Sequence, residues 1–563
     1  MKVVIIGGVA GGATAAARLR RLDEQAEIVV FERSGYVSYA NCGLPYYIGG
    51  VIEDPEALTL QTPESFFNRF RVDMRVRHEV TALHPDRKTV SVKNLETGEE
   101  FEEGYDKLLL SPGAKPTQPR LPGVGLEKLF TLRTVEDTFR IKDYINAHHP
   151  KSAVLAGGGF ISLELAENLR ELGLEVTIVQ RPRQLMNPFD PDMAAFIHGE
   201  VRRHGIHLAL GHTVEGFTEQ DGGVDVLLQD AAPLHADMVV LAIGVTPDTA
   251  LAKEAGLELG LKGSIVVNAR METSVPDIYA VGDAVQVKHF VTGQDAVISL
   301  AGPANKQGRI AADNICGGDS RYQGSQGSSV IKVFDLTAAA TGVNETNAKK
   351  TGLDVDTVVL SPMSHAGYYP GGKLMTMKVV FERETCRLLG AQIVGYEGVD
   401  KRIDVLATAI RAGMTAIQLK DLDLAYAPPY SSAKDPVNMA GFMVENLANG
   451  IVKQFHTEDV GALPHDGSVT LLDARTAWEY AGGHIEGFQN IPVDELRERL
   501  GEIEPGKPVY VICQSGLRSY IACRILAGYG YETYNFAGGF RFYDAVTNDR
   551  RLIQSATACG MDQ

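Results

Sequence analysis

Two stretches of the chain repeat one pattern of apolar and polar positions. In each, a short apolar strand runs into a glycine-rich turn, a helix rich in alanine and leucine follows, and a second apolar strand closes the unit. The first unit spans residues 2–34 (KVVIIGGVAGGATAAARLRRL to EIVVFERS), and the second spans residues 152–182 (SAVLAGGGFISLELAENLREL to EVTIVQRP). Because this order is the signature of a dinucleotide-binding unit, the pattern predicts two nucleotide sites.

The pattern changes twice further along the chain. Residues 277–285 (DIYAVGDAV) predict a strand that ends at Gly282 and Asp283, and SLAGPANKQGRIAADNI predicts a helix after a Gly-Pro turn. Residues 328–446 contain shorter strands followed by helices (VIKVFDLTAAATG, LMTMKVVFER, LLGAQIVG), as expected of an α+β domain with an antiparallel sheet. Proline and glycine thin the periodicity at 449–467, and the alternating strands and helices beyond it predict a separate domain.

Length and charge limit the classes of protein that fit. A chain of 563 residues predicts roughly three to four domains. The sequence has no apolar run of about 18 residues, and the start MKVVIIGG predicts a buried strand rather than a signal peptide, so we expect a cytoplasmic protein. The formal net charge of −17 argues against binding to nucleic acid or to anionic membranes.

The six cysteines are widely separated and form no CxxC pair. This spacing indicates neither a structural zinc site nor a disulfide framework, and we expect no metal. Each thiol is then an inert core residue or a nucleophile. Cys316, Cys386 and Cys559 have no motif around them and receive no role.

The first glycine turn has the residues of a pyrophosphate site. Gly7 and Gly12 permit a tight turn and close helix–strand packing, so that N–H groups at the helix start face a pyrophosphate. Glu32 lies about twenty residues past Gly12, where a carboxylate can accept from a ribose hydroxyl. Val9 replaces the middle glycine of a strict GxGxxG, and this motif alone also fits the turn of an ordinary αβ domain.

The second turn leaves the choice of nicotinamide cofactor open. Gly157 and Gly159 fit the motif, with Ser162 as a small residue in place of the third glycine. Gln180 occupies the position where an acid favours NAD, and two arginines that suit the 2′-phosphate of NADP follow at Arg181 and Arg183. NADH and NADPH both remain candidates. One turn into the helix, Glu164 either faces the nicotinamide or is a solvated helix residue.

These features together resemble the flavoprotein disulfide reductases over residues 1–446. The resemblance implies an α/β fold with two dinucleotide-binding domains, followed by an α+β dimerisation domain. The FAD-binding domain would comprise 1–115 and 245–327, the NAD(P)-binding domain 116–244, the dimerisation domain 328–446 and a linker 447–460. LLLSPGAKPTQPRLPG matches the bridge between the nucleotide domains. The resemblance places Asp283 on the ribityl chain of FAD and implies further cofactor contacts from Gly8, Ala10, Gly11, Arg33, Val80, Ala114, Gly282 and Ala301.

The segment SGYVSYANCGLPYYIGG contains one thiol, Cys42. Disulfide reductases with a CxxxxC pair have a second cysteine five residues earlier, where this chain has Val37, so the partner sulfur must come from a ligand or another domain. NCGLPYYIGG is similar to coenzyme A-disulfide reductases and to the related persulfide reductases and NADH oxidases. In that subfamily the lone cysteine alternates between thiolate and a mixed disulfide with coenzyme A. The alternative is a buried structural cysteine.

The same resemblance implies a coenzyme A site that two subunits of a homodimer share. The phenols would act as proton donors to a departing thiolate, since they are protonated at neutral pH. Taken singly, the arginines also fit solvated helix charges and the tyrosines ordinary interface aromatics. One subunit would contribute Thr14, Arg18, Arg21, Ser38, Asn41 and Arg71. The partner would contribute Tyr368 (with Tyr369 as the alternative), Tyr426 and Lys434.

The C-terminal region resembles a rhodanese domain, an α/β fold expected at 461–555, on the segments VTLLDARTAWEYAGGHIEGFQNIPVDELRERL and PVYVICQSGLRSYIACRIL. Cys513 ends an apolar strand, and the loop QSGLRS leads into a helix whose N–H groups can hold an anionic persulfide. Gly516 permits the turn and Arg518 adds positive charge. By the same resemblance, Asp473, Arg475 and His484 occupy positions that support the loop. Cys523 lies among alanines and leucines of the following helix and is expected in the core. A degenerate, non-catalytic domain is the alternative.

The sequence therefore predicts an FAD-dependent NAD(P)H oxidoreductase. It would reduce coenzyme A persulfide, polysulfide or coenzyme A disulfide at Cys42, with sulfane sulfur handled at Cys513. One rival is an NADH oxidase or peroxidase in which the lone cysteine forms a sulfenic acid. Another is a reductase whose C-terminal domain only senses sulfide or binds a partner.

Overall fold

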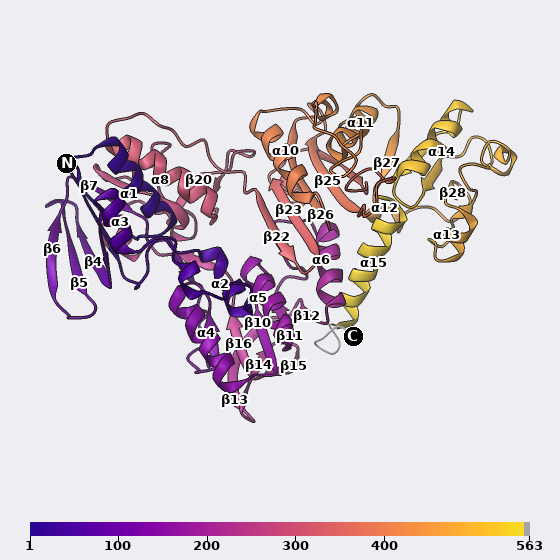
Figure 1. Cartoon of the computed structure of the whole chain (residues 1–563). Helices are drawn as coiled ribbons and strands as arrows, with labels where there is room; N and C mark the ends of the chain where they lie inside the picture. Colours follow the sequence, from indigo (N-terminus) through magenta and orange to yellow (C-terminus); the bar gives the residue numbers. More distant parts are fainter. Residues whose placement is uncertain (557–563) are drawn as a thin grey trace. The chain divides into compact units, whose positions relative to one another are not determined.

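The structure, a computed structural model, describes residues 1–556. They form two compact units (Figure 1). Of the described residues, the first unit comprises 1–183 and 205–327, and the second comprises 184–204 and 328–556. Within the described residues, no helix has both the length and the apolar character that crossing a bilayer requires.

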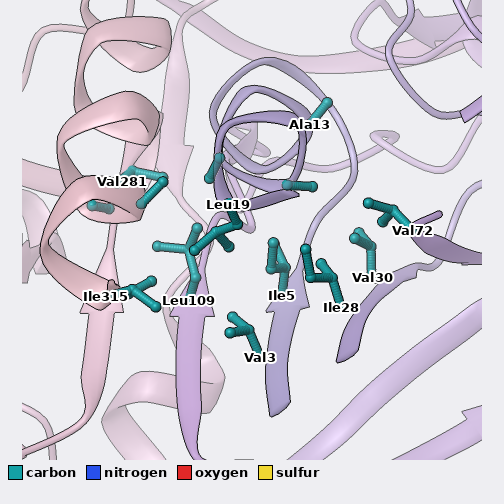
Figure 2. Packing of buried hydrophobic residues seen from close by; sticks show 14 of the residues in the cluster. Val3, Ile5, Ala13, Leu19, Ile28, Val30, Val72, Leu109, Val281 and Ile315 are labelled. Atoms are coloured by element: carbon teal, nitrogen blue, oxygen red, sulfur yellow. The ribbon is translucent and has the colours of Figure 1, made fainter. Parts of the chain in front are cut away.

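A parallel five-stranded sheet organises the first unit, in the order β19-β7-β1-β2-β3. Figure 2 shows Leu19 and Ile315, from the two helices that pack together beside this sheet, against Val3, Ile5 and Leu109 of its strands. The strands and these helices are β1 (Lys2–Ile6), β2 (Glu27–Glu32), β3 (Asp73–Val76), β7 (Lys107–Leu110), β19 (Ile278–Ala280), α1 (Ala10–Leu22) and α8 (Ala301–Ile315).

Smaller elements surround this sheet within the first unit. One is a three-stranded antiparallel sheet of β4 (His78–His84), β5 (Thr89–Asn94) and β6 (Glu100–Gly104). Short sheets join β18 (Ile265–Val266), β20 (Val285–Lys288) and β21 (Asp295–Ala296), and pair β8 (Ala114–Pro116) with β17 (Val245–Pro247). The short helices are α2 (Leu44–Gly49), α3 (Pro63–Phe70) and α7 (Ala250–Glu254).

A second parallel sheet repeats the arrangement of the first, in the order β12-β11-β10-β16-β9. Its elements are β9 (Leu129–Thr131), β10 (Ser152–Ala156), β11 (Glu175–Gln180), β12 (His207–Leu210), β16 (Met238–Leu241), α4 (Val135–His148) and α5 (Phe160–Glu171). An antiparallel sheet of β13 (Val214–Gln220), β14 (Gly223–Leu228) and β15 (Ala231–Ala236) accompanies it. Both predicted strand-turn-helix-strand units are therefore present.

The second unit begins with an antiparallel sheet in the order β22-β23-β26-β25-β24. The segment VIKVFDLTAAATG, expected as one strand, is instead a hairpin that turns at Phe334, whose φ is +52°. The elements are β22 (Ser329–Val333), β23 (Leu336–Gly342), β24 (Val355–Leu360), β25 (Met375–Glu382), β26 (Leu388–Gly395), α9 (Glu345–Lys350), α10 (Val399–Arg411) and α11 (Pro436–Ala448).

Helix α6 (Pro191–Arg203) does not belong to the unit that its place in the sequence predicts. It lies between β11 and β12 in the chain, within the range expected for the NAD(P)-binding domain, yet residues 184–204 group with the second unit. The buried Lys378 ammonium of β25 lies 3.2 Å from Asp190 and 2.7 Å from both Asp192 and Glu345. Because unpaired charges are costly to bury, this cluster holds the start of α6 on the antiparallel sheet.

The last sheet is parallel, in the order β27-β31-β30-β28-β29. The stretch 447–460 expected as a linker contains β27, which pairs with β31, so the sheet starts earlier than the predicted residue 461. The elements are β27 (Lys453–Phe455), β28 (Thr470–Asp473), β29 (Gln489–Asn490), β30 (Val509–Ile512), β31 (Thr533–Phe536), α12 (Thr457–Val460), α13 (Ala477–Ala481), α14 (Leu517–Gly528) and α15 (Gly539–Ala556).

Helix α15 packs against α6 within the second unit. The buried His198 accepts from the Leu185 N–H at Nε2 (2.9 Å), so its Nδ1 carries the proton and donates to Asp549 (2.9 Å). Arg202 donates to the other carboxylate oxygen at 2.5 Å. These bonds join the end of the chain to a helix more than 300 residues earlier in the sequence.

Candidate active sites

The start of α1 is open to an anionic ligand. No side chain caps this helix, and its first turn contains no acidic residue. The backbone also comes close here, since a Cβ on Gly12 would lie 1.9 Å from the Gly7 carbonyl oxygen. A helix start with free N–H groups favours a pyrophosphate, so the residues present fit the dinucleotide expected at this turn.

Two carboxylates flank this turn. Glu32 accepts from the N–H groups of Gly8 and Ser34, each at 2.9 Å, which fixes its carboxylate beside the turn. Asp283, in the turn after β19, pairs with Arg133 at 2.8 Å. Both lie where the sequence predicts cofactor contacts, and their roles stay predictions.

The other residues expected at FAD lie on several elements of the first unit. Arg33 is exposed and pairs with Asp248 at 2.7 Å. Val80 is buried in β4, and Ala114 is buried in β8. Ala301 is the first residue of α8, and Gly282 donates its N–H to Gln307 at 2.7 Å.

The second glycine turn has the same open helix start. Gly159 is the N-cap residue of α5, which has no side-chain cap and no acidic residue in its first turn. Gln180 ends β11 half-buried, while Arg181 and Arg183 are exposed beyond it. A second dinucleotide fits here, and the arrangement offers cationic side chains but no carboxylate at the ribose position.

Cys42 lies in the turn that precedes α2, and its side chain is exposed. Helix α2 packs against α5, which carries Glu164. The surrounding protein atoms, and next the Glu164 carboxylate, raise the pKa of the Cys42 thiol, while Arg133 acts in the opposite direction. Burial, and then Glu167, raise the pKa of Glu164 to about 7. Glu164 therefore changes charge near neutral pH, and its charge affects the ionisation of Cys42.

Replacing Glu164 by glutamine is expected to speed alkylation of Cys42 about two- to fivefold above pH 7, because the variant lacks the carboxylate that raises the thiol pKa. Below about pH 6 most Glu164 is protonated, so the two proteins should react alike. Iodoacetamide labelling across this range, followed by peptide mass spectrometry, measures the difference. Glu171→Gln, at the other end of α5, is the matched control. Equal rates for wild type and Glu164→Gln at about pH 8, where Glu164 is charged and the thiol is only partly ionised, would contradict the coupling.

The predicted coenzyme A residues of the first unit lie on α1 and on the loops near its two ends. On α1, Thr14 donates to Asn305 at 2.6 Å, Arg18 pairs with Asp313 at 2.7 Å, and Arg21 is exposed in the last turn. The charge of Arg18 is thus partly balanced within the protein.

The loop residues of this predicted site contain one unsatisfied polar atom. The Asn41 side-chain oxygen is buried without a hydrogen-bond partner, an arrangement that a bound ligand can relieve. Ser38 has a φ of +46°, and its N–H donates to the Gly8 carbonyl at 2.9 Å. Arg71 ends α3 with its guanidinium over the Phe67 ring.

The second unit brings the two predicted tyrosines together. The hydroxyl oxygens of Tyr368 and Tyr426 lie 2.6 Å apart, although 58 residues separate them in the chain. Both side chains are exposed, Tyr368 by 76%. The hydrogen bond that Tyr426 donates to Tyr368 stabilises its protonated form and raises the pKa of Tyr426, so this phenol stays protonated at neutral pH. Lys434 is exposed on the loop before α11, and Tyr369 is also exposed.

Sequence reasoning missed Arg402, which holds the tyrosine loops. Its buried guanidinium donates to the Ser364 carbonyl at 2.9 Å, to the Ser431 hydroxyl at 3.1 Å and to the Asp435 carboxylate at 3.2 Å. Ser364 precedes one tyrosine and Ser431 follows the other, so a single side chain ties both loops. Arg402 lies in the first turn of α10, where no sequence motif indicates this contact.

Cys513 directly follows β30, in the loop that leads to α14. Its side chain is fully buried, and its sulfur accepts from the Gly516 N–H at 3.1 Å and from the Ser519 hydroxyl at 3.2 Å. Gly516 has a φ of +96°, a conformation that favours glycine. The loop geometry expected from the sequence is therefore present, with two neutral donors aimed at the sulfur.

Charged residues around this loop occur as pairs. Arg518 forms a two-bond ion pair with Glu479 of α13, each bond 2.7 Å. Asp473 and Arg475 form a second, buried pair at 2.7 Å, and Arg475 also donates to the Gly483 carbonyl. His484 stacks on Tyr480 nearby. Sequence reasoning missed Glu479, which balances the charge assigned to Arg518.

Comparison with known families agrees with this geometry. The model for the pyridine nucleotide-disulphide oxidoreductases matches residues 1–308, the model for their dimerisation domain matches 328–436, and the model for a rhodanese-like domain matches 456–545. The first match covers more than half of the 563 residues. The chain belongs to the pyridine nucleotide-disulphide oxidoreductases.

Similar proteins match either about four fifths of this chain or nearly all of it. Coenzyme A disulfide reductase of Staphylococcus aureus is 38% identical over 444 residues, which are 78% of this chain and 99% of the relative. The reduced Bacillus anthracis protein CoADR-RHD is 48% identical, covers 98% of both chains and has a TM-score of 0.95. The NAD-dependent persulfide reductase of A. fulgidus is 38% identical over 96% of this chain and all of its own, with a TM-score of 0.90.

The protein is accordingly an FAD-dependent pyridine nucleotide-disulphide oxidoreductase with a C-terminal rhodanese domain. This confirms the predicted fold class and the predicted enzyme class. Two thiols of this oxidoreductase lie in motifs, Cys42 and Cys513, whereas Cys523 is buried in the core as expected. Cys386 is buried, Cys316 is half-buried, and Cys559 lies outside the described residues.

Proposed function

We propose that this oxidoreductase uses NADH or NADPH to reduce coenzyme A persulfide and coenzyme A disulfide at Cys42, and that its rhodanese domain supplies or accepts sulfane sulfur at Cys513. The observation that carries the proposal is the Cys513 loop, in which a backbone N–H and a hydroxyl contact the sulfur. In the reductase part of the same chain, Cys42 is the one cysteine that lies in a sequence motif. A reductase of disulfides alone has no use for such a loop.

Cys42 is the nucleophile of the proposed reduction. Its thiolate attacks the carbon-bonded sulfur of coenzyme A persulfide, which forms a mixed disulfide and releases hydrosulfide with the electron pair of the broken S–S bond. Attack on coenzyme A disulfide gives the same mixed disulfide and releases coenzyme A thiolate. FAD held at the start of α1 would supply the two electrons that NAD(P)H provides, which would return both sulfurs to thiolates.

The tyrosine pair supplies the proton in this proposal. Tyr426 has a raised pKa and its hydroxyl lies 2.6 Å from that of Tyr368, so Tyr426 is protonated at neutral pH and can protonate a departing thiolate. The dimerisation-domain match supports a homodimer in which the pair reaches the partner's Cys42. Thr14, Arg21 and Lys434 would then bind coenzyme A from the two subunits.

Cys513→Ser is expected to abolish sulfur transfer to and from the rhodanese domain but to leave reduction of a freely diffusing persulfide within about twofold of wild type, because hydride transfer uses other residues. Sulfur transfer is measured as the persulfide formed on an added acceptor thiol, and reduction as NADH oxidation. Cys523→Ser, which alters a buried thiol on the next helix, is the matched control. An equal loss of both activities would mean that the two thiols form one obligatory relay.

The proposed substrates are tested with the purified holoenzyme. NADH oxidation should be fastest with coenzyme A persulfide, measurable with coenzyme A disulfide, and slow with oxygen alone. Mass spectrometry of the denatured protein should find FAD, and coenzyme A should be released by reductant. Oxygen-dependent oxidation at the rate seen with either sulfur substrate would instead make the protein an NADH oxidase.

A further inference from the structure

Arg518 forms an ion pair with Glu479 and interacts electrostatically with Cys513. Both guanidinium nitrogens lie 2.7 Å from separate oxygens of the carboxylate. The N-cap residue Thr476 fixes the carboxylate from the other side, with its N–H at 3.0 Å and its hydroxyl at 2.8 Å. The Arg518 guanidinium, followed by the Thr476 contacts, lowers the pKa of Glu479 to about 2. The pair therefore stays ionised, and its net charge is zero.

Two other arginines near the loop do not add free positive charge at the sulfur. Arg475 pairs with the buried Asp473 and lies over the Phe540 ring. The backbone N–H of Arg541 bonds to the loop, but its half-buried guanidinium faces the Phe196 ring of α6. The sulfur is thus held by neutral donors and by the start of α14.

The chain neighbours of the two paired residues expose apolar side chains. Trp478, next to Glu479, is 85% exposed, and Leu517, next to Arg518, is 59% exposed. Leu517 also follows the glycine that donates to the sulfur. Exposed apolar side chains beside a loop without net charge favour a sulfur donor that has an organic group over a small inorganic dianion such as thiosulfate.

We propose that Glu479 makes Cys513 selective for the sulfane sulfur of organic persulfides over that of thiosulfate. The inference rests on the sulfur transfer proposed above. The Cys513 thiolate attacks the terminal sulfur of R–S–SH, the S–S bond breaks, and R–S⁻ leaves with the bonding electrons, while the proton stays on the new Cys513 persulfide. With thiosulfate the same attack releases sulfite, and the products carry the three negative charges of the reactants.

The two donors differ in the charge that they bring to a thiolate. Thiosulfate approaches with two negative charges, and a protonated persulfide with a neutral body approaches with none. Charges interact strongly at separations of a few ångströms. An unpaired Arg518 would attract the thiosulfate dianion and so favour it over a neutral persulfide. Because Glu479 neutralises Arg518, thiosulfate loses this electrostatic attraction. Solvent reaches both side chains in part, which limits the expected effect to about tenfold.

The test measures loading of Cys513 in the FAD-bound protein, with Cys42→Ser as the common background. Each variant receives 2-hydroxyethyl persulfide or thiosulfate, and the rate of sulfur addition to the Cys513 peptide is followed by mass spectrometry. Glu479→Gln should raise the thiosulfate-to-persulfide rate ratio about tenfold, and added potassium chloride should reduce this rise. Glu479→Asp keeps the charge and should stay near wild type. Glu495→Gln removes a carboxylate from another ion pair of the domain and is the matched control.

Arg518→Met is an independent variant in which the thiosulfate-to-persulfide rate ratio should change in the direction opposite to that in Glu479→Gln. It leaves the carboxylate unpaired, so the thiosulfate-to-persulfide ratio should fall below that of wild type. An unchanged ratio in Glu479→Gln, or wild type loading from thiosulfate as fast as from the persulfide, would overturn the selectivity. Failure of both donors to load Cys513 in the wild-type domain would instead overturn the sulfur transfer on which the inference rests.

Discussion

Replacing Cys42 by serine is expected to abolish NADH-dependent reduction of coenzyme A persulfide and disulfide, by about a thousandfold or more, while the protein still binds FAD. A serine hydroxyl is a far weaker nucleophile than a thiolate and forms no mixed disulfide. FAD binding should survive because the contacts predicted for FAD, at the helix start of α1 and at Glu32, do not involve the thiol. NADH oxidation measures the loss, and flavin absorbance of the purified variant measures retention.

Cys316→Ser is the matched control, since this half-buried thiol lies in the same unit but in no motif. It should keep wild-type turnover. Full activity in the Cys42 variant would remove this thiol from the mechanism, whereas loss of flavin together with activity would show that the substitution damages the fold rather than the chemistry.

Tyr426→Phe is expected to lower turnover about ten- to a thousandfold with little change in the thermal unfolding temperature. The ring and its packing stay, and the variant loses only the hydroxyl that lies 2.6 Å from that of Tyr368. Turnover should fall more than the affinity for coenzyme A. Tyr430→Phe, an exposed tyrosine four residues on, is the matched control. Equal turnover in Tyr426→Phe and wild type would remove the proton-donor role.

The shared site is tested by mixing subunits. Chains with Cys42→Ser and chains with Tyr368→Phe and Tyr426→Phe are each nearly inactive as homodimers. After reversible dissociation, a heterodimer contains one site with both an intact thiol and intact phenols if the partner supplies the phenols. Activity should then return to about half of the wild-type value per dimer. Verified heterodimers without recovered activity would place the phenols and the thiol in one subunit.

Residues whose function depends on local backbone could be predicted from the sequence. The glycine turns at Gly7 and Gly157 and the loop around Cys513 each lie between a strand and the helix that follows, so their geometry depends on adjacent residues. The approach of Tyr368 to Tyr426 could be predicted only through resemblance, because it joins two distant loops.

Contacts between distant elements could not be predicted. The place of α6 in the second unit depends on Lys378, which meets Asp190 and Asp192 from a strand almost 200 residues away. Charged residues are usually exposed, so the sequence pattern of α6 fits a surface helix equally well. Arg402 contacts Asp435 and Glu479 contacts Arg518, and each partner lies on another element of the fold. No sequence motif indicates either contact.

The contact between α15 and α6 makes the rhodanese domain a structural support for the rest of its unit. A chain cut after Asn446 would lose Asp549, leave the buried His198 and Arg202 without that carboxylate, and uncover the Phe196 ring that now packs near Phe542. Such a protein would tend to aggregate whatever its chemistry. Loss of reductase activity on deletion of the domain would therefore measure folding, and point substitutions at the sulfur are the way to separate the two thiols.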